Sequence, residues 1–125
     1  MSRCGTPVAV LVLAFGWAAA ATAAAQSYSN APGAVLRGLD KLAGQTDDMS
    51  LRVGESAEFG RMTLTLSECR YPEENPAGNA FAWIAIHESD DPSPVFEGWM
   101  IADSPALNAL DHARYDFWVL RCIVN

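Results

Sequence analysis

The stretch "RMTLTLSECRY", residues 61–71, alternates apolar and polar side chains from its second residue to its seventh. Successive side chains of a β-strand point to opposite faces, so the methionine and the two leucines would share one face. The stretch therefore predicts a strand with one face in a hydrophobic core. Cys69 falls with the polar set, which indicates either a bulge at Ser67 and Glu68 or a cysteine on the outer face.

Three further segments, residues 80–88, 94–102 and 115–124, are rich in the aromatic and branched residues that favour strands. The first of them, "AFAWIAIHE", is apolar on both faces, which is typical of a central strand covered on both sides. Residues 35–53 have leucines at helical spacing, but two glycines weaken a helix. A hairpin is therefore favoured there.

Turn signals rich in Gly, Pro, Asn and Asp separate these segments. The pattern predicts a mainly β fold, a small antiparallel β-sandwich or barrel of six to seven strands. It would form one β-rich domain over residues 34–125.

One short helix is expected before the last strand. Ser104 is a favourable N-cap, and Pro105 suits the first helical position. Leu107 and Leu110 lie three residues apart and would share one face of the helix. His112 would end it, where the helix dipole favours a positive charge.

The N-terminus has the pattern of a secretory signal peptide, predicted to span residues 1–25. Arg3 supplies the positive charge, an apolar run follows, and three alanines before Gln26 fit a cleavage site. The protein is therefore expected in the periplasm. An uncleaved membrane anchor is the alternative, because residues 7–25 carry no charge and are just long enough to span a bilayer. Residues 26–33 are predicted to form a flexible leader.

The chain is acidic, with a formal net charge of −7 at pH 7 that becomes −8 if cleavage removes Arg3. Such a surface repels phosphate backbones, and no basic stripe offsets it, so nucleic-acid binding is not expected. Anionic membrane surfaces are disfavoured for the same reason, and no membrane insertion is expected after signal cleavage.

Two cysteines, Cys69 and Cys122, remain once the signal peptide that carries Cys4 is removed. An even number of cysteines in an exported chain predicts a disulfide between them. The bond would close a loop of 54 residues and stabilise the domain by about 4 kcal/mol in the chain-entropy model. Redox and zinc sites fit less well, because they need a C-x-x-C pair or more thiols with nearby histidines.

Two long motifs resemble a known bacterial family. They are "FGRMTLTLSECRYPEENPAGNAFAWI", residues 59–84, and "PVFEGWMIADSPALNALDHARYDFWVLRC", residues 94–122. Both are similar to the exported Gram-negative proteins that share domain of unknown function 2155. The chain departs from the family pattern at Asp103, where the family tends to have Ser, and at Ala113, where it tends to have Pro. The resemblance implies the family's fold and export, and it carries no activity.

A hydrolase interpretation would take Ser104 as nucleophile, His112 as base, and Asp111 or Asp116 to orient the histidine. A helix would separate the serine from the histidine by about 12 Å along its axis, too far for contact. Pro105, which follows the serine, has no N–H to donate. Ser104 is therefore interpreted as a helix cap, and no catalytic residue, metal ligand or cofactor is predicted.

The aromatic residues are the better functional signal. Trp83 and Trp118 are expected to fill the core. Trp99 and Tyr115 are expected to be partly exposed, and with His112 they form a candidate binding patch.

The function predicted from these observations is a non-catalytic periplasmic or cell-envelope β-domain. It would be a protein-interaction or cell-wall-associated module, held together by one disulfide, whose partner is an unidentified envelope protein or the cell wall. The alternative is a small-ligand or glycan-binding domain that uses an exposed aromatic patch, and a hydrolase is the remote alternative. The oligomeric state is left open.

Overall fold

The computed structural model describes residues 5, 13–14, 16 and 27–125. Apart from those isolated positions, the predicted signal peptide of residues 1–25 lies outside the described residues, as does Gln26. Among the residues that are described, no helix has the length and apolar character needed to cross a membrane.

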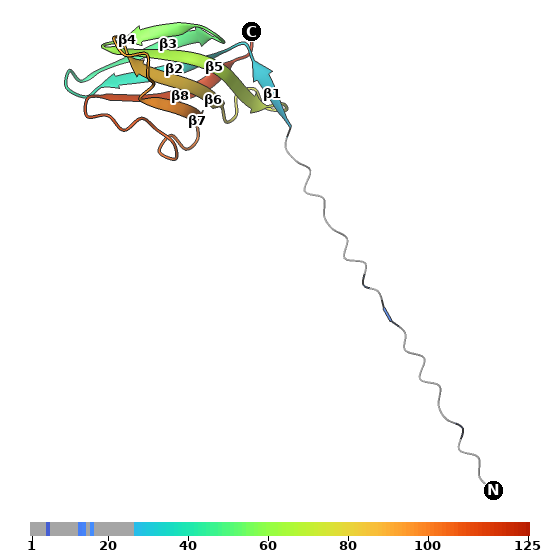
Figure 1. Ribbon diagram of the computed structural model, residues 1–125. Helices are drawn as coiled ribbons and strands as arrows, with labels where there is room; N and C mark the ends of the chain where they lie inside the picture. Colours follow the sequence, from blue (N-terminus) through green and yellow to red (C-terminus); the bar gives the residue numbers. More distant parts are fainter. Residues whose placement is uncertain (1–4, 6–12, 15, 17–26) are drawn as a thin grey trace.

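Eight strands form two antiparallel sheets (Figure 1). Sheet A has the order β1-β5-β6-β7, with β4 also paired to β5, and sheet B has the order β3-β2-β8. The strands of sheet A are β1 (Tyr28–Ala31), β4 (Ser56–Phe59), β5 (Met62–Pro72), β6 (Phe81–Glu88) and β7 (Phe96–Ile101). Those of sheet B are β2 (Gly33–Asp40), β3 (Gln45–Arg52) and β8 (Tyr115–Ile123).

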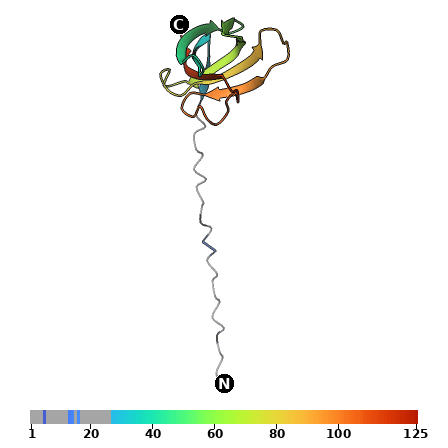
Figure 2. The ribbon, with the colours of Figure 1, turned by 90° about the vertical axis from the view of Figure 1, so that its left-hand side faces the viewer.

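The mainly β fold is confirmed, and the two sheets stay separate instead of closing into a barrel. Viewed from one end, they curve around a shared interior (Figure 2). The alternation in β5 points Met62, Leu64 and Leu66 into this interior, where none of them is exposed. Ile84 and Ile86 of β6 meet them there, also fully buried. The core therefore lies between the sheets, as the alternation in residues 61–71 predicts.

The strand count exceeds the predicted six to seven because the N-terminal part of the domain is also a strand. Residues 28–33, predicted to belong to a flexible leader, form β1 and the first residue of β2, so that prediction is wrong there. Tyr28 to Ala31 pair with β5, and the chain crosses to sheet B at Pro32. Proline has no N–H for a ladder, which suits a position where a strand leaves one sheet for the other.

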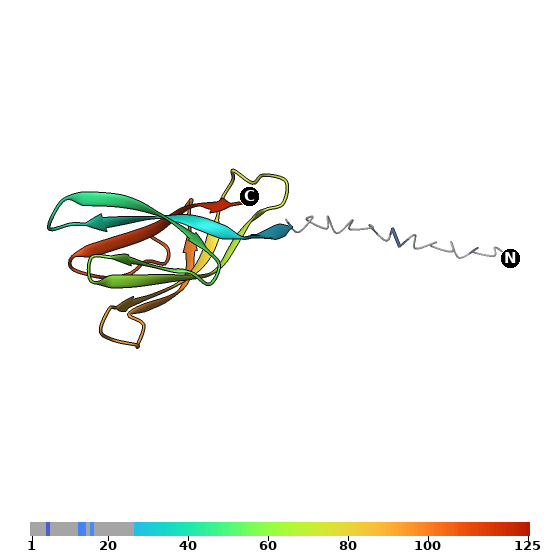
Figure 3. The ribbon, with the colours of Figure 1, turned by 90° about the horizontal axis from the view of Figure 1, so that it is seen from above.

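The position after this corner accepts only glycine. A Cβ on Gly33 would lie 2.5 Å from the carbonyl oxygen of Leu51 in β3. The small residue therefore lets β2 approach β3 closely as soon as it enters sheet B. The continuous run from β1 into β2 is visible from above (Figure 3).

Residues 35–53 form the predicted hairpin of β2 and β3, whose register pairs Asp40 with Gln45 across a four-residue turn. Gly44 adopts a φ of +66° in this turn, a conformation that glycine takes without strain. The two glycines that argue against a helix therefore occur in a hairpin, and one of them shapes its turn.

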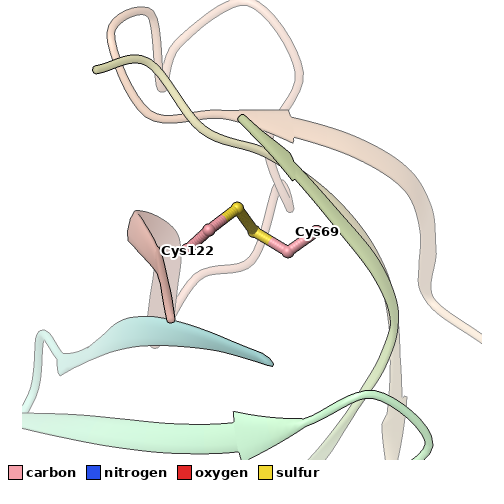
Figure 4. The surroundings of a disulfide bond; sticks show 2 residues. All are labelled: Cys69 and Cys122. Carbon is pink, nitrogen blue, oxygen red and sulfur yellow. A yellow bond between two sulfur atoms is a disulfide. The ribbon is translucent and has the colours of Figure 1, made fainter. Parts of the chain in front are cut away.

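A disulfide joins Cys69 of β5 to Cys122 of β8, with an S–S distance of 2.08 Å (Figure 4). Both half-cystines are buried between the sheets. The β5 register shifts between Leu66 and Glu68, so the predicted bulge is present and turns Cys69 inward. A second register shift, opposite Val35 and Leu36 of β2, lies in β8 before Cys122. Each strand therefore reverses its inward face once, just before its cysteine.

The predicted short helix is wrong: the described residues contain no helix, and 102–114 form turns and extended chain. Ser104 accepts a hydrogen bond from Leu107 N in a single turn, so it does not cap a helix. Asn108 donates from Nδ2 to the carbonyl oxygen of Trp99, and Leu110 is buried while Leu107 is 75% exposed. A helix would put the two leucines on one face, so tertiary contacts override the local helix signals.

The end of this connection is tied to the β2–β3 turn by one ion pair. Arg114 donates to the carboxylate of Asp40 from Nε and Nη2, at 3.2 and 3.0 Å. The same carboxylate accepts the backbone N–H groups of Leu42 and Ala43. The hydrogen bonds from Arg114, with those from the turn, hold the pKa of Asp40 below its ordinary value, although burial opposes this shift.

Replacing Cys69 and Cys122 together by alanine should lower the free energy of unfolding by about 2–5 kcal/mol, because the open chain gains conformational freedom when unfolded. Urea denaturation of the purified variant measures the loss. Reduced wild-type protein should show a similar loss. A double variant within about 0.5 kcal/mol of the oxidised wild type would contradict a stabilising disulfide.

Replacing Asp40 by asparagine should destabilise the protein at pH 7, because Arg114 loses its ionic partner. A carboxyl whose pKa is lowered by folding stabilises above its unfolded pKa of about 3.9, and the effect disappears as pH falls through the folded pKa. The stability gap between wild type and variant should therefore close between about pH 5 and pH 2 in urea titrations. Asp90→Asn, in an exposed turn, is the control. A gap that does not vary with pH would refute the ionic account.

Candidate functional site

The outer face of sheet A carries an aromatic groove, which we define by Tyr28, Arg70, Phe81, Trp99 and Ile101. The groove has a volume of about 390 Å³. Its rings meet edge to face: Tyr28 and Phe81 have centroids 5.3 Å apart with an interplanar angle of 88°. This is the geometry that aromatic pairs prefer.

The strand register builds the groove row by row. Arg70, Phe81 and Ile101 are partners across β5, β6 and β7, so their side chains share the outer face. Trp83 and Trp99 form the next row, with ring centroids 5.4 Å apart and an interplanar angle of 79°. Three adjacent strands therefore hold the groove, and the core beneath them fixes their spacing.

Arg70 is the only charged residue among the five that line the groove. Its guanidinium carbon lies 5.2 Å from the ring centroid of Trp99, a cation–π geometry. Nη2 donates to Glu68 Oε1 at 3.1 Å, and both side chains are close to half exposed. The ion pair is too exposed to add much stability, so its role is to orient the guanidinium over the ring.

The prediction that β6 is covered on both sides is half right. Ala82, Ile84 and Ile86 are fully buried against the core. Phe81 and Trp83, on the other face, are only partly buried, and their ring contacts come from neighbouring strands of the same sheet. A central strand with two apolar faces thus has one face without a covering layer among the described residues.

The predicted patch of Trp99, His112 and Tyr115 does not assemble. Trp99 lies on the outer face of sheet A, whereas Tyr115 is 2% exposed in the core, so its predicted partial exposure is wrong. His112 contacts Tyr115 at a ring-centroid distance of 5.3 Å, and its Nδ1 accepts the backbone N–H groups of Arg114 and Tyr115. The histidine therefore holds the chain at the start of β8.

Trp83 and Trp118, predicted to fill the core, are both only partly buried. The residues on either side of Trp118, Phe117 and Val119, point inward, so the tryptophan lies on the outer face of sheet B. Phe59, also partly buried, packs against the core edge-on to Phe117, with centroids 5.5 Å apart. The large indoles thus lie on the outer faces, and smaller side chains fill the inner faces.

No hydrogen bond among the described residues joins Ser104 to His112. The imidazole Nε2 lies 3.9 Å from Glu88 Oε1, and Nδ1 is occupied by backbone donors. In the described part of the chain, no three His, Cys, Asp or Glu side chains are grouped as a metal ion would require.

Charge is distributed unequally between the sheets. The strands of sheet A contain four glutamates and one arginine. Those of sheet B contain four aspartates and three arginines. The aromatic groove therefore lies on the more acidic sheet of an acidic chain.

A family of proteins described as uncharacterized and conserved in bacteria, DUF2155, matches residues 34–122 of the chain. The chain belongs to this family. The match includes every groove residue except Tyr28, which precedes it. The description of DUF2155 names no activity, so membership of the family assigns no role to the groove.

The DUF2155 chain is also similar to an uncharacterized protein of Rickettsia prowazekii (strain Madrid E), with 25% identity over 87 residues. The aligned part is 67% of this chain and 56% of the relative, so the chain spans little more than half the length of that relative. No solved structure matches.

Sequence reasoning identified Trp99 but missed the other four lining residues. The alternation of side chains in β6 is the signal that identifies Phe81. Phe81 and Trp83 alternate with the buried alanine and isoleucines of β6, so they lie on the face away from the core. Arg70 gave no such signal, because the bulge at Ser67 reverses its face.

Proposed function

We propose that this DUF2155 domain is a non-catalytic binding module of the bacterial cell envelope and that it holds a partner protein in the aromatic groove. One observation carries the proposal: β6 is apolar on both faces, and its outer face has no covering layer in the described chain. Exposed aromatic surface is unfavourable in water, by roughly 25 cal/mol for each Å². A partner that covers this face removes that cost.

The composition of the groove favours a protein over a glycan. Tryptophan, tyrosine and arginine are the residues most enriched among those that dominate the binding energy of protein interfaces. Glycans require several polar groups to pair with their hydroxyls, whereas three of the five lining residues, Phe81, Trp99 and Ile101, offer only one indole N–H between them. Polar contacts are left to Arg70 and the Tyr28 hydroxyl. Binding of cell-wall glycan is the second candidate, because the rings of Tyr28 and Trp99 could stack on sugars.

Export completes the proposal. Residues 1–25 have the composition of a cleavable signal peptide. The disulfide between Cys69 and Cys122 suits an oxidising compartment such as the periplasm, because cytosolic thiols are kept reduced. The folded domain would then meet its partner among envelope proteins.

A photoreactive amino acid at Ile101 should crosslink the protein, expressed in its own bacterium, to a discrete partner. The same amino acid at Trp118, on the outer face of sheet B, should give no such product. Adding Trp99→Ala to the Ile101 probe should reduce the yield at least about fivefold, the loss expected for a residue worth 1 kcal/mol or more. Immunoblotting and mass spectrometry of the product provide the measurement.

Trp118→Ala added to the same probe is the matched control and should leave the yield unchanged. Equal crosslinking at Ile101 and Trp118 would show that the groove is not the binding face. A product that muramidase digestion returns to monomer size would favour the glycan candidate. Absence of any product would contradict the proposed function.

Intact-mass analysis of the periplasmic fraction should find a chain that starts at Gln26 and lacks two hydrogens because of the disulfide. The expected mass follows from cleavage after Ala25. A full-length chain recovered from the membrane fraction would instead establish the anchor, and a reduced mature chain would contradict the oxidising location.

A further inference from the structure

We propose that the groove binds an extended, proline-rich segment of the partner, with Lys or Arg residues flanking the prolines. This inference rests on the proposed function and specifies the chemistry of its partner. It follows from the backbone surroundings of the groove, its ring geometry and the charge around it.

The two central strands of the groove, β5 and β6, leave no edge for an added strand. β5 is paired on one side with β1 and β4 and on the other with β6, and β6 is paired with β5 and β7. At the outer edge of β7, Asn108 donates from Nδ2 to the carbonyl oxygen of Trp99 at 2.9 Å. A partner segment that lies over β5 and β6 is therefore recognised by side-chain contacts and not by strand addition.

The shape of the groove favours an extended segment over a helix. Its volume of about 390 Å³ is near the lower end for sites that bury drug-sized ligands. A helix with its side chains is about 10–12 Å across, which is too wide for a groove of this size. The perpendicular rings of Tyr28 and Phe81 are in edge-to-face contact, and with Trp99 and Ile101 they line an apolar groove. Aromatic-lined grooves of this kind receive proline rings of polyproline II segments.

Arg70 supplies the polar contact that such a segment needs. A polyproline II helix has no internal hydrogen bonds, so its carbonyl oxygens remain free to accept. The guanidinium has five N–H donors, and Glu68 takes one of them. Its position over Trp99 keeps the guanidinium at the groove, where the remaining donors can bond the carbonyl groups of a bound segment.

Charge complementarity determines the residues that flank the prolines. Glu97 lies two positions before Trp99 and is exposed, as are Asp103 beyond Ile101 and Glu73 after β5. Glu73 donates its backbone N–H to the carbonyl of Ser27, so it lies beside the Tyr28 end of the groove. Cationic residues on both sides of the prolines would therefore meet carboxylates at both ends.

The test is a titration of the purified, oxidised protein with a synthetic peptide in which proline pairs alternate with leucine and an arginine stands at each end. Tryptophan fluorescence and calorimetry should both show saturable binding with a dissociation constant below about 1 mM. Replacing the prolines by alanine, or the arginines by glutamate, should weaken binding at least about fivefold.

Variants of the protein localise the effect. Trp99→Ala should weaken binding at least about fivefold, and Glu97→Lys, a surface change that leaves the core untouched, should weaken it in the same direction. Trp118→Ala should leave the dissociation constant unchanged. Thermal unfolding of each variant verifies that it is folded. If Trp99→Ala does not fold, Glu97→Lys still tests the groove.

Failure to bind the proline peptide at about 5 mM, or equal binding of the alanine and glutamate peptides, would overturn the inference. Binding of muropeptides instead of the proline peptide would also overturn it. So would dimers that form with increasing protein concentration and that Trp99→Ala abolishes. If crosslinks at Ile101 still form to a partner protein, only the proline-rich chemistry fails. If these crosslinks are also absent, the proposed function fails with it.

Discussion

The disulfide between Cys69 and Cys122 can form only because a bulge in each of its two strands takes up one extra residue. If β5 continued its alternation through Ser67 without the bulge, the cysteine would face solvent and Arg70 would point into the core. With the bulge, the cysteine faces inward and the arginine stands over Trp99. One local irregularity therefore positions both the covalent link between the sheets and the charged side chain of the groove.

The two faces of β6 carry apolar side chains of different size. The inner face of β6 offers alanine and isoleucine, which fit against β5 and sheet B, and Phe81 and Trp83 take the opposite face. Edge-to-face contacts with Tyr28 and Trp99 shield these rings in part. The rings are thus partly shielded and still present a surface whose burial would be favourable.

The sequence predicts well those features whose cause is local. The alternation in β5, the hairpin of β2 and β3, and the cysteine parity that indicates a bulge are all carried by adjacent residues. The helix at residues 104–112 failed because its signals, a serine cap and two spaced leucines, compete with distant demands: Asn108 bonds the carbonyl of Trp99, and Leu110 enters the core. Such demands arise only when the strands are in place.

The same limit explains the candidate site. Trp99 could be selected because it is large and lies beside a glycine, but its neighbours in the groove come from β1, β5 and β6. Tyr28 lies in a segment whose polar composition conceals a strand, since β1 is held by pairing with β5 and not by its own pattern. Only the register of four strands brings these residues together.

The covalent link also determines how the domain would respond to mechanical force. A pull on the two ends of the chain passes through the S–S bond, so residues 70–121 carry no tension while the bond is intact. β6, β7 and most of the groove lie inside that protected loop. β1 lies outside it, and its ladder with β5 would be loaded along the strand. Tension would therefore act on the strand that carries Tyr28, whereas Phe81 and Trp99 lie inside the loop that the disulfide closes.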